Sequence, residues 1–402
     1  MNMEKTLNLI HNEFKMLEPL PAILDIKDYS EDDFLPALDR CSEACDSFKR
    51  RAYEEYKTLK FPKWKRAPLE DLQLVKPIPN SKYIIEGPEI IRPMSEIKNF
   101  EKELLLNLDF QGSDRKFTLL ADAFSREGVI IYTEKETNYT EPIFLNAMSE
   151  GFLASNLIVV GESSRLSIVF YGQNEGTFRA ITNRFLLRKN AQLNVLFVNF
   201  ASNNAYQFFN NYYLLDENAR LQLYDINLGG EVTAPYHLVK AAAQGAKAVV
   251  KPLFFPANHE KIDMLYLGRI TASEATVEIE GIGAVSGYSK AIFRGFIDIK
   301  KGAKNANGTE HSSTVMLSDT AIVQSIPSLF VDENEVNASH AASVGTVESE
   351  KIYYLMTRGL SKNEALKLVV TGAFDPVIEE IGRIFGEGAV GGVRDVIGER
   401  IG

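Results

Sequence analysis

The sequence predicts a mainly β protein: a right-handed parallel β-helix flanked by N-terminal and C-terminal α-helical regions. Three observations predict this fold. Short apolar runs with frequent Gly and Asn begin near residue 117. Within these runs a small residue recurs at a nearly constant interval. Before and after the runs, apolar residues instead follow the three- and four-residue steps of amphipathic helices.

One small residue sets the phase of each repeat. Steps of 27, 28, 27, 29 and 28 residues separate Ser164, Ala191, Ala219, Ala246, Ala275 and Ala303. Each interval also holds a second strand-like run, such as "QFFNNYYLL". A chain that returns to the same place at each repeat forms stacked coils, so each strand pairs with its equivalent one coil later. We therefore expect Leu193, Leu221 and Val277 to point into one buried column.

Other repeat architectures fit the sequence less well. The pattern of a leucine-rich repeat is absent, and propeller blades need about 40 residues. Parallel crossovers are almost always right-handed, which predicts the hand of the β-helix. After Ala303 the phase fails, because Ala321 follows only 18 residues later. The β-helix is therefore expected to narrow or end there.

Helical spacing is found in two N-terminal stretches, residues 3–18 and about 31–60. Pro62 and Pro68 then interrupt the pattern. Residues 75–115 give no clear pattern. The predicted organisation is an N-terminal helical region at 1–90, a β-helix core at 100–338 and a C-terminal helical module at 339–402.

The C-terminal module carries helix-boundary signals. Ile352, Leu355 and Met356 share one helical face, and Gly359 suits a left-handed C-terminal cap. Ser361 and Glu364 form a capping box. A third helix is expected to start at Asp375-Pro376, because proline is accepted in a first turn. "GEGAVG", residues 386–391, matches G-x-G-x-x-G but follows a helix and has few residues after it, so we interpret it as a flexible tail.

Composition excludes several classes of protein. The net charge of −10 argues against nucleic acid as the main partner. There is no signal peptide pattern and no apolar run of about 20 residues, which argues against a membrane segment. Two cysteines cannot form a disulfide framework, and a cytoplasmic location is expected.

Two short motifs have both a functional and an ordinary explanation. Cys41 and Cys45 are four residues apart, so both thiols could share a helix face and, with His11, form part of a metal site. Small buried hydrophobic residues are the favoured interpretation. "KTLKFPKWKR" interleaves basic residues with Phe61 and Trp64, as single-strand binders do, but a helix C-terminus also favours cations.

No common catalytic motif is present. Polysaccharide-cleaving enzymes often use parallel β-helices with clustered carboxylates, whereas Asp and Glu are scattered here. A β-helix carbohydrate-active enzyme, lyase or hydrolase, is therefore an alternative without support from a motif.

Residues 314–374 contain a characteristic order of short elements: Leu317-Ser-Asp, Pro327, Asp332-Glu333, His340, Gly345, Tyr354-Leu355 and Arg358-Gly359. This order resembles the SufB/SufD family of iron–sulfur cluster assembly proteins. Two weaker similarities are "FTLLADAFSREGVIIY" at 117–132 and "WKRAPLEDL" from Trp64, the latter similar to an element of SufD. The resemblance implies a parallel β-helix between helical termini.

Departures from the family pattern indicate the type of member. SufB has a candidate ligand cysteine in its β-helix and a glutamate after the matched histidine. Here no cysteine follows Cys45, and Ala341 follows His340. SufD often has a cysteine two residues before the histidine, where this chain has Ala338. The chain therefore resembles SufD or a divergent member of the family, and its predicted β-helix has no cysteine to hold a cluster.

The resemblance implies a non-enzymatic subunit that works with a SufB-like scaffold and a SufC-like ABC ATPase. It assigns ATPase docking to the C-terminal helices, where the candidate contacts are Tyr354, Arg358, Gly359, Lys362 and Lys367. It assigns partner pairing to the end of the β-helix. The sequence does not distinguish a SufB-like partner from a second copy of the chain, and a homodimer with a structural or carrier role is a further alternative.

His340 is the candidate cofactor residue. A lone histidine is usually structural, with its imidazole hydrogen-bonded in a polar pocket. Here small neighbours leave the imidazole accessible, the stretch lies where strands give way to helices, and the family's matching histidine is placed at the SufB interface. His340 would then supply one ligand to a transient iron–sulfur cluster shared with a partner, which must supply the thiolates.

Overall fold

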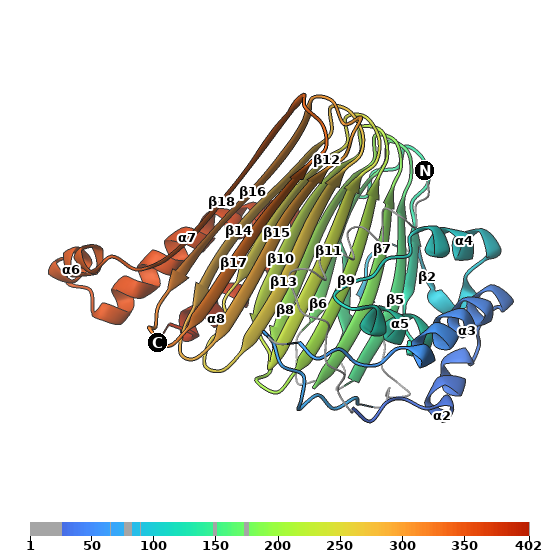
Figure 1. The fold of residues 1–402 in the computed structure, drawn as a ribbon, viewed down its shortest axis with the longest axis horizontal. Coiled ribbons are helices and arrows are strands. Elements are labelled where there is room, and N and C mark those ends of the chain that lie inside the picture. The colour runs from blue at the N-terminus through green and yellow to red at the C-terminus, as the bar shows by residue number, and fades with distance from the viewer. Residues whose placement is uncertain are drawn as a thin grey trace.

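The computed structural model describes residues 26–64, 66–75, 83–88, 90–147, 151–172 and 177–401, so the helix expected at 3–18 lies outside the described residues. Most of these residues form a β-helix with helices at both ends (Figure 1). Its strands alternate between two sheets, and nearly all neighbouring strands are parallel. The predicted fold class is confirmed.

The two sheets run along the whole length of the β-helix. The first sheet contains β1 (Tyr83–Glu86), β4 (Ile143–Ala147), β6 (Arg165–Gly172), β8 (Gln192–Ala201), β10 (Arg220–Gly229), β12 (Lys247–Phe254), β14 (Thr276–Val285), β16 (Ala306–Met316) and β18 (Val336–Thr346). The second contains β2 (Ile91–Pro93), β3 (Val129–Tyr132), β5 (Gly151–Val160), β7 (Phe178–Leu187), β9 (Tyr206–Leu215), β11 (Val232–Ala241), β13 (Lys261–Ile270), β15 (Lys290–Ile299) and β17 (Ile322–Val331).

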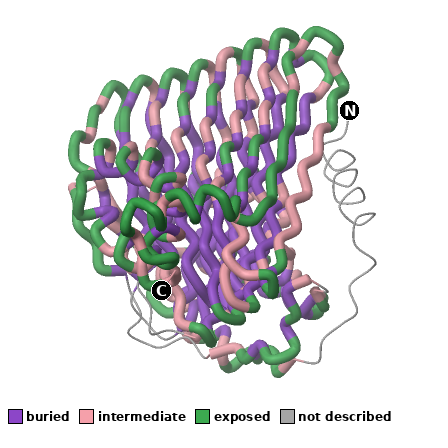
Figure 2. Tube along the Cα trace, turned by 90° about the vertical axis from the view of Figure 1, so that its left-hand side faces the viewer, coloured by how far each residue is buried: buried purple, intermediate pink, exposed green. Residues whose placement is uncertain are grey.

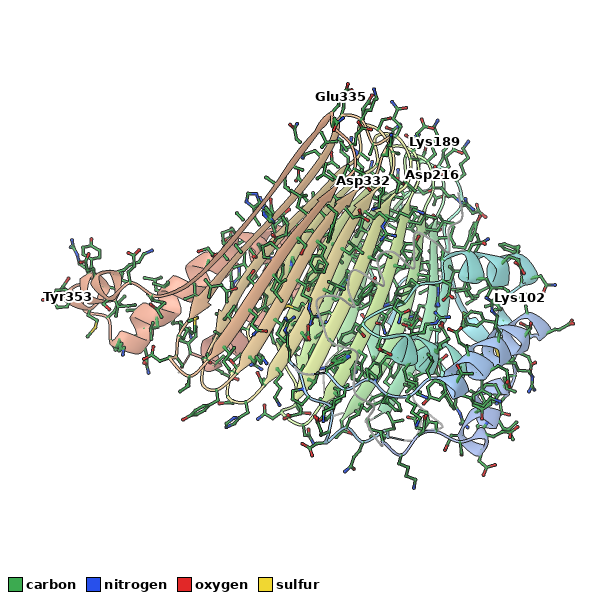
Figure 3. All side chains as sticks on the ribbon, viewed as in Figure 1. Lys102, Lys189, Asp216, Asp332, Glu335 and Tyr353 are labelled. Carbon is green, nitrogen blue, oxygen red and sulfur yellow. A yellow bond between two sulfur atoms is a disulfide. The ribbon has the colours of Figure 1, made fainter. Side chains whose placement is uncertain are left out.

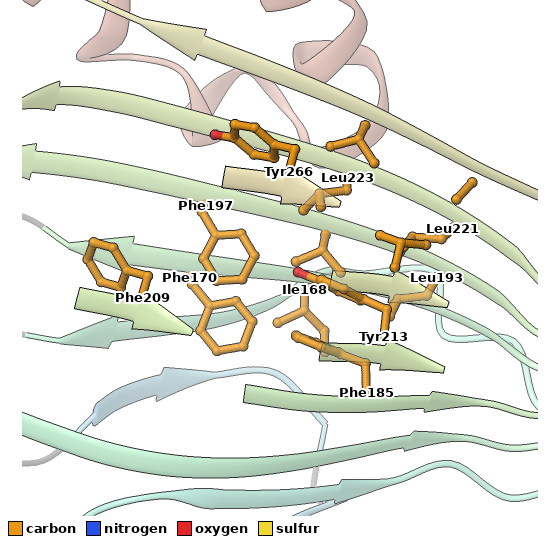
Figure 4. Packing of buried hydrophobic residues seen from close by; sticks show 14 of the residues in the cluster. Ile168, Phe170, Phe185, Leu193, Phe197, Phe209, Tyr213, Leu221, Leu223 and Tyr266 are labelled. Atoms are coloured by element: carbon orange, nitrogen blue, oxygen red, sulfur yellow. The ribbon is translucent and has the colours of Figure 1, made fainter. Parts of the chain in front are cut away.

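Alternate residues of every strand point into the space between the sheets, where they stack on the equivalent residues of the next coil. Leu193 pairs with Leu221, Leu221 with Ala248, and Ala248 with Val277. All four are at most 1% exposed, which confirms the predicted column. Figure 4 shows Leu193 and Leu221 packed beside Ile168, Phe197 and other inward-facing residues.

The corner before each strand of the first sheet explains the repeating small residue. A residue in the left-handed region, with φ between 54° and 70°, occupies the same place in successive corners: Ser163, Asn190, Asn218, Gly245, Glu274 and Asn305. The next residue turns inward and is buried, so only a small side chain fits. In the coil of Asn305 that next residue is Ala306, so the prediction that Ala303 holds the slot is wrong.

The β-helix neither narrows nor ends after Ala303, as the failed phase had suggested. The register step is 27 residues from Arg165 to Gln192 and 30 residues from Ala306 to Val336, so the later coil is longer. Ala321 lies at the opposite corner, directly before β17, and does not belong to the alanine series at all. The last strand, β18, extends to Thr346, so the predicted boundary at 338 falls within a strand.

The N-terminal helices pack on the outer face of the second sheet. They are α2 (Glu31–Phe34), η1 (Leu35–Leu38), α3 (Glu43–Thr58), η2 (Met94–Glu96), α4 (Asn99–Asn107) and α5 (Arg115–Phe124). Phe117 of α5 stacks on Phe208 of β9 with ring centroids 3.5 Å apart. The helix expected at 31–60 is interrupted because Arg40 has φ 62° and Ser42 caps a new helix. The first part of the predicted core, from residue 100, is not β-helix but holds most of α4 and all of α5.

Three C-terminal helices, α7 (Lys362–Phe385), η3 (Glu387–Ala389) and α8 (Val393–Glu399), pack on the outer face of the first sheet. Helix α6 (Ser349–Thr357) precedes them and projects away from the sheet, in contact with α7 (Figure 1). The Ser361–Glu364 capping box is present, and Gly359 follows α6 with φ 98°. No third helix starts at Asp375: α7 continues through Pro376. Its apolar face, including Phe374, lies on the sheet and maintains the helix despite the proline.

Residues 386–401 are not the flexible tail that the sequence suggested. Val393 and Ile397 of α8 are fully buried against the first sheet. Arg400 forms an ion pair with Glu260 and donates a hydrogen bond to the carbonyl of Phe255 at 3.0 Å.

Figure 2 shows the burial pattern of the molecule, with buried residues inside the coils and exposed residues along the corners. Among the described residues, no helix is long and apolar enough to cross a membrane.

Substitution of Leu221 by aspartate tests the stacked column. We expect a loss of about 3 kcal/mol or more in the free energy of unfolding, because the carboxylate would be buried without a partner. Chemical or thermal denaturation measures the loss. The neighbouring residue Gln222 is only half-buried, so Gln222→Asp should cost about 1 kcal/mol or less. The column would be contradicted if Gln222→Asp were the more damaging of the two changes.

Candidate site at the open end of the beta-helix

The two ends of the β-helix are finished differently. At the N-terminal end, β1 pairs antiparallel with β4 and β2 pairs antiparallel with β3. Tyr83 of β1 closes the interior there, with its ring centroid 4.9 Å from that of Phe152. At the C-terminal end, β17 and β18 are the last strands of their sheets and have no further strand beside them in the described chain. The interior is therefore closed at one end and open at the other.

The last coil presents its inward-facing residues at this open end. β18 is in register with β16, and β17 is in register with β15, whose inward positions are buried. In the last coil, the register partners of these inward positions are Val323, Ser325, Pro327, Leu329 and Val331 on β17, and Val336, Ala338, His340, Ala342 and Val344 on β18. We call these ten residues the end face. It is largely apolar, and Val331 and Val344 are 43% and 42% exposed.

His340 lies within β18, not in a loop before the helices. Its residue is exposed, so it is not enclosed in a polar pocket as a structural histidine would be. The neighbouring inward positions of the strand are Ala338 and Ala342, which are too small to cover the imidazole. The expectation that the side chain is accessible at an open face therefore agrees with the structure. The functional role of His340 stays a prediction.

Glu310 lies directly beneath His340 and is a site residue that the sequence analysis missed. The two residues are register partners on β16 and β18. Glu310 is 0% exposed, and neither carboxylate oxygen has a hydrogen-bond partner within the described part of the chain. Burial raises the pKa of this carboxyl to about 7, and the hydroxyl of Ser312 lowers it by a smaller amount. The alternation of small and polar residues in "ANGTEHSST" was the available signal, because it places Glu310 on the inward face.

The candidate docking residues lie on a helical arm, residues 349–369, which begins three residues after β18 ends. Tyr354, Arg358, Gly359, Lys362 and Lys367 are all exposed. The Arg358 guanidinium lies 5.2 Å from the centre of the Tyr354 ring.

The arm also exposes large apolar side chains. Tyr353, Tyr354, Met356 and Leu368 are 70%, 56%, 44% and 51% exposed. Figure 3 places Tyr353 at the tip of the arm, far from the corner residues Asp332 and Glu335. Exposed aromatic rings beside cations are typical of a surface that binds another protein.

The other sequence candidates have structural surroundings. The sulfur atoms of Cys41 and Cys45 are in contact, but Cys41 precedes α3, so the two do not share a helix face. Within the described residues, no three His, Cys, Asp or Glu side chains are grouped to hold a metal ion; His11 is not described. Phe61 is buried, and the Trp64 ring packs 5.8 Å from that of Phe117, so neither ring is presented for stacking on bases.

A second polar cluster is enclosed in the middle of the β-helix. Asn156 donates to Asn183 at 2.7 Å, and Asn183 donates to Asn211 at 2.7 Å. The imidazole of His237 lies 3.1 Å from the carboxylate of Asp225. All five residues are at most 1% exposed. This cluster satisfies its own hydrogen bonds and is closed to ligands, so we assign it a structural role.

Comparison with known proteins identifies the family to which the β-helix and the C-terminal part of the chain belong. Residues 143–373 match the family model described as the SufBD core domain of SUF-system FeS cluster assembly. The chain belongs to this SufBD family. The matched residues include the whole end face and the arm.

Curated relatives carry the same family name. Iron–sulfur cluster assembly SufBD family proteins of Staphylococcus saprophyticus and Staphylococcus epidermidis are 25% identical over 283 residues. One from Staphylococcus aureus is 25% identical over 286 residues. Each match covers 67% of this chain and 60% of the relative. The chain therefore spans less than two thirds of the length of these SufBD proteins.

The buried carboxyl of Glu310 predicts a pH-dependent stability. Its pKa is about 7 in the folded chain and near 4.5 in the unfolded chain. Below about pH 4.5 the carboxyl is protonated in both states, so its burial lowers the free energy of unfolding least. The free energy of unfolding falls as the pH rises from there through about 7. We expect the unfolding free energy of the wild type, relative to Glu310→Gln, to fall by on the order of 1–2 kcal/mol from pH 5 to 7.5. Denaturant titrations at several pH values measure the difference, and a difference that is constant with pH would contradict the prediction.

Proposed function

We propose that this protein is a SufD-like, non-catalytic subunit of an iron–sulfur cluster assembly complex. The observation that carries the proposal is the contrast between the closed N-terminal end and the open end face, within a chain of the SufBD family. An apolar interior that ends without a cover favours a second chain as the cover. Family membership also leaves the alternative of a carbohydrate-active enzyme without support.

The end face is the proposed pairing surface for a SufB-like scaffold. Its side chains are mostly aliphatic, and the outer edges of β17 and β18 carry backbone groups with no strand neighbour among the described residues. A partner that presents a similar β-helix end could bury the apolar residues and pair with these edges. A second copy of this chain could do the same, and it is the competing outcome of the binding experiment.

Sequence differences favour a SufD-like role over a SufB-like one. The last cysteine of the chain is Cys45, so the β-helix has no thiolate for a cluster. His340 is followed by Ala341, where SufB has a glutamate. In this role His340 would offer one imidazole nitrogen to a cluster that is cargo of the complex, and the partner would supply thiolates. The chain itself would catalyse no reaction.

The arm is the proposed docking site for a SufC-like ABC ATPase. The arm is joined to the fixed part of α7, where Glu380 accepts hydrogen bonds from Tyr224 at 2.7 Å and from Lys251 at 2.6 Å. Its outer part carries exposed Tyr353 and Tyr354 beside cationic side chains. A fixed base with an exposed, mixed apolar and basic tip is suited to transmit movement from an ATPase to the β-helix.

Charge reversal on the arm tests ATPase docking. Lys362→Glu combined with Lys367→Glu should lower recovery of the ATPase about tenfold or more in a pull-down from native lysate, because the basic side chains of the proposed docking surface would become acidic. Both lysines are exposed, so the melting temperature should stay within about 2 °C of the wild type.

Lys60→Glu is the matched control, since Lys60 is an exposed lysine at the other end of the molecule. It should leave recovery unchanged. Full recovery of the ATPase with the double variant would place the docking site elsewhere.

Replacement of His340 tests its role in the complex. His340→Ala should assemble with its partners and keep its melting temperature, because the side chain is exposed, yet should abolish cluster formation on the purified complex. Cluster content is measured by iron and sulfide analysis and by visible absorption. His311 is an exposed histidine on the outer face of β16, so the control variant His311→Ala should keep the full cluster content. A normal cluster yield from His340→Ala would refute the role.

A further inference from the structure

One inward-facing column of the first sheet changes its chemistry at the open end. Successive register partners along this column are Ile143, Ile168, Val195, Leu223, Val250, Ile279, Glu310 and His340. The first six are aliphatic and at most 2% exposed. Stacking of like residues is sufficient to hold such a column together, so a carboxylate and an imidazole in its last two places have no packing explanation.

The fold makes space for Glu310. Gly295 lies across the interior on β15, and a Cβ at this position would collide with the Cγ atom of Glu310. The carboxylate therefore lies within the interior, between the two sheets. Among the described residues neither buried oxygen has a hydrogen-bond partner, and the only neighbouring hydroxyl, that of Ser312, also lies 2.9 Å from the hydroxyl of Ser325. An unpaired buried carboxylate is costly, which indicates a ligand that the chain alone does not provide.

Glu310 and His340 are placed to bind one ligand together. They are direct register partners on neighbouring parallel strands, which lie about 4.8 Å apart, and both occupy inward positions. Metal–oxygen and metal–nitrogen bonds of about 2.0–2.2 Å let two such side chains share one ion. We propose that Glu310 and His340 form a two-ligand site for a divalent transition metal, ferrous iron in the proposed role, at the open end of the β-helix.

The donor set fits this metal class. A carboxylate oxygen and an imidazole nitrogen suit Fe²⁺, Mn²⁺ and Co²⁺, whereas thiolates would favour softer ions. Bound metal would neutralise the buried carboxylate, and water or groups of the partner would complete its coordination. The assignment of iron rests on the proposed function, but binding of a divalent metal by these two residues does not.

Metal titration of the full-length chain tests the site. Co²⁺ is the probe, followed by its visible absorption, and anaerobic Fe²⁺ is followed by calorimetry. We expect one ion per wild-type chain and an affinity at least about tenfold lower for Glu310→Gln and for His340→Ala. Glu310→Gln removes only the charge, so the variant keeps the shape of the side chain. His311 directly follows Glu310 but lies exposed on the outer face, so His311→Ala should bind the metal as the wild type does.

The outcomes separate this proposal from the proposed function. Wild-type affinity in Glu310→Gln, loss in only one of the two variants, or no binding by the wild type would each overturn the site. Bound Co²⁺ should also raise the melting temperature of the wild type but not of Glu310→Gln, which distinguishes lost binding from lost folding. Metal binding without recovery of an ATPase or SufB-like partner would leave the site standing and refute the complex.

Discussion

The structure depends on one contact, the stacking of each inward-facing side chain on its equivalent in the next coil. Every coil buries its interior only because another coil covers it, so the two terminal coils must be covered by something else. At the N-terminal end the chain supplies antiparallel β1, with Tyr83 pointing inside. At the C-terminal end β18 is followed by the helical arm, and no further strand of the described chain covers the end face. The site follows from this asymmetry.

The outer faces of the sheets are covered by the chain itself. α3 and α5 pack on the second sheet, and α7 and α8 pack on the first. Large apolar side chains remain exposed at the end face, including Val331 and Val344, and on the arm, including Tyr353 and Tyr354. These two surfaces are next to each other in sequence, since α6 begins three residues after β18. A partner at the end face and an ATPase on the arm could thus be coupled through a short connection.

Much of the fold could be predicted because its main signal is periodic. The alanine series gave the coils and the buried column, since a left-handed corner residue forces a small residue after it. The same local signal failed where a coil changed length, so Ala303 was chosen instead of Ala306. Pro376 suggested a helix start, but packing of Phe374 and its neighbours on the first sheet overrode the local preference.

The candidate site was only half visible in the sequence. His340 was found through a family resemblance, and its accessibility followed from small neighbours. Glu310 was missed because its importance depends on register with His340 and on space left by Gly295, and both relations join residues far apart in the chain. Periodicity can show which face a residue occupies, but not which residue of another coil lies above it. Docking on the arm was indicated by resemblance alone.

Hydrogen–deuterium exchange on the isolated chain and on the purified complex tests the central claim that the end face is a pairing surface. In the isolated chain, the amides at the outer edges of β17 and β18 should exchange quickly, because none of the described strands pairs with these edges. In the complex, we expect strong slowing of exchange in these two strands and little change at the closed end around β1 and β4. Unchanged exchange in β17 and β18 within an intact complex would contradict it.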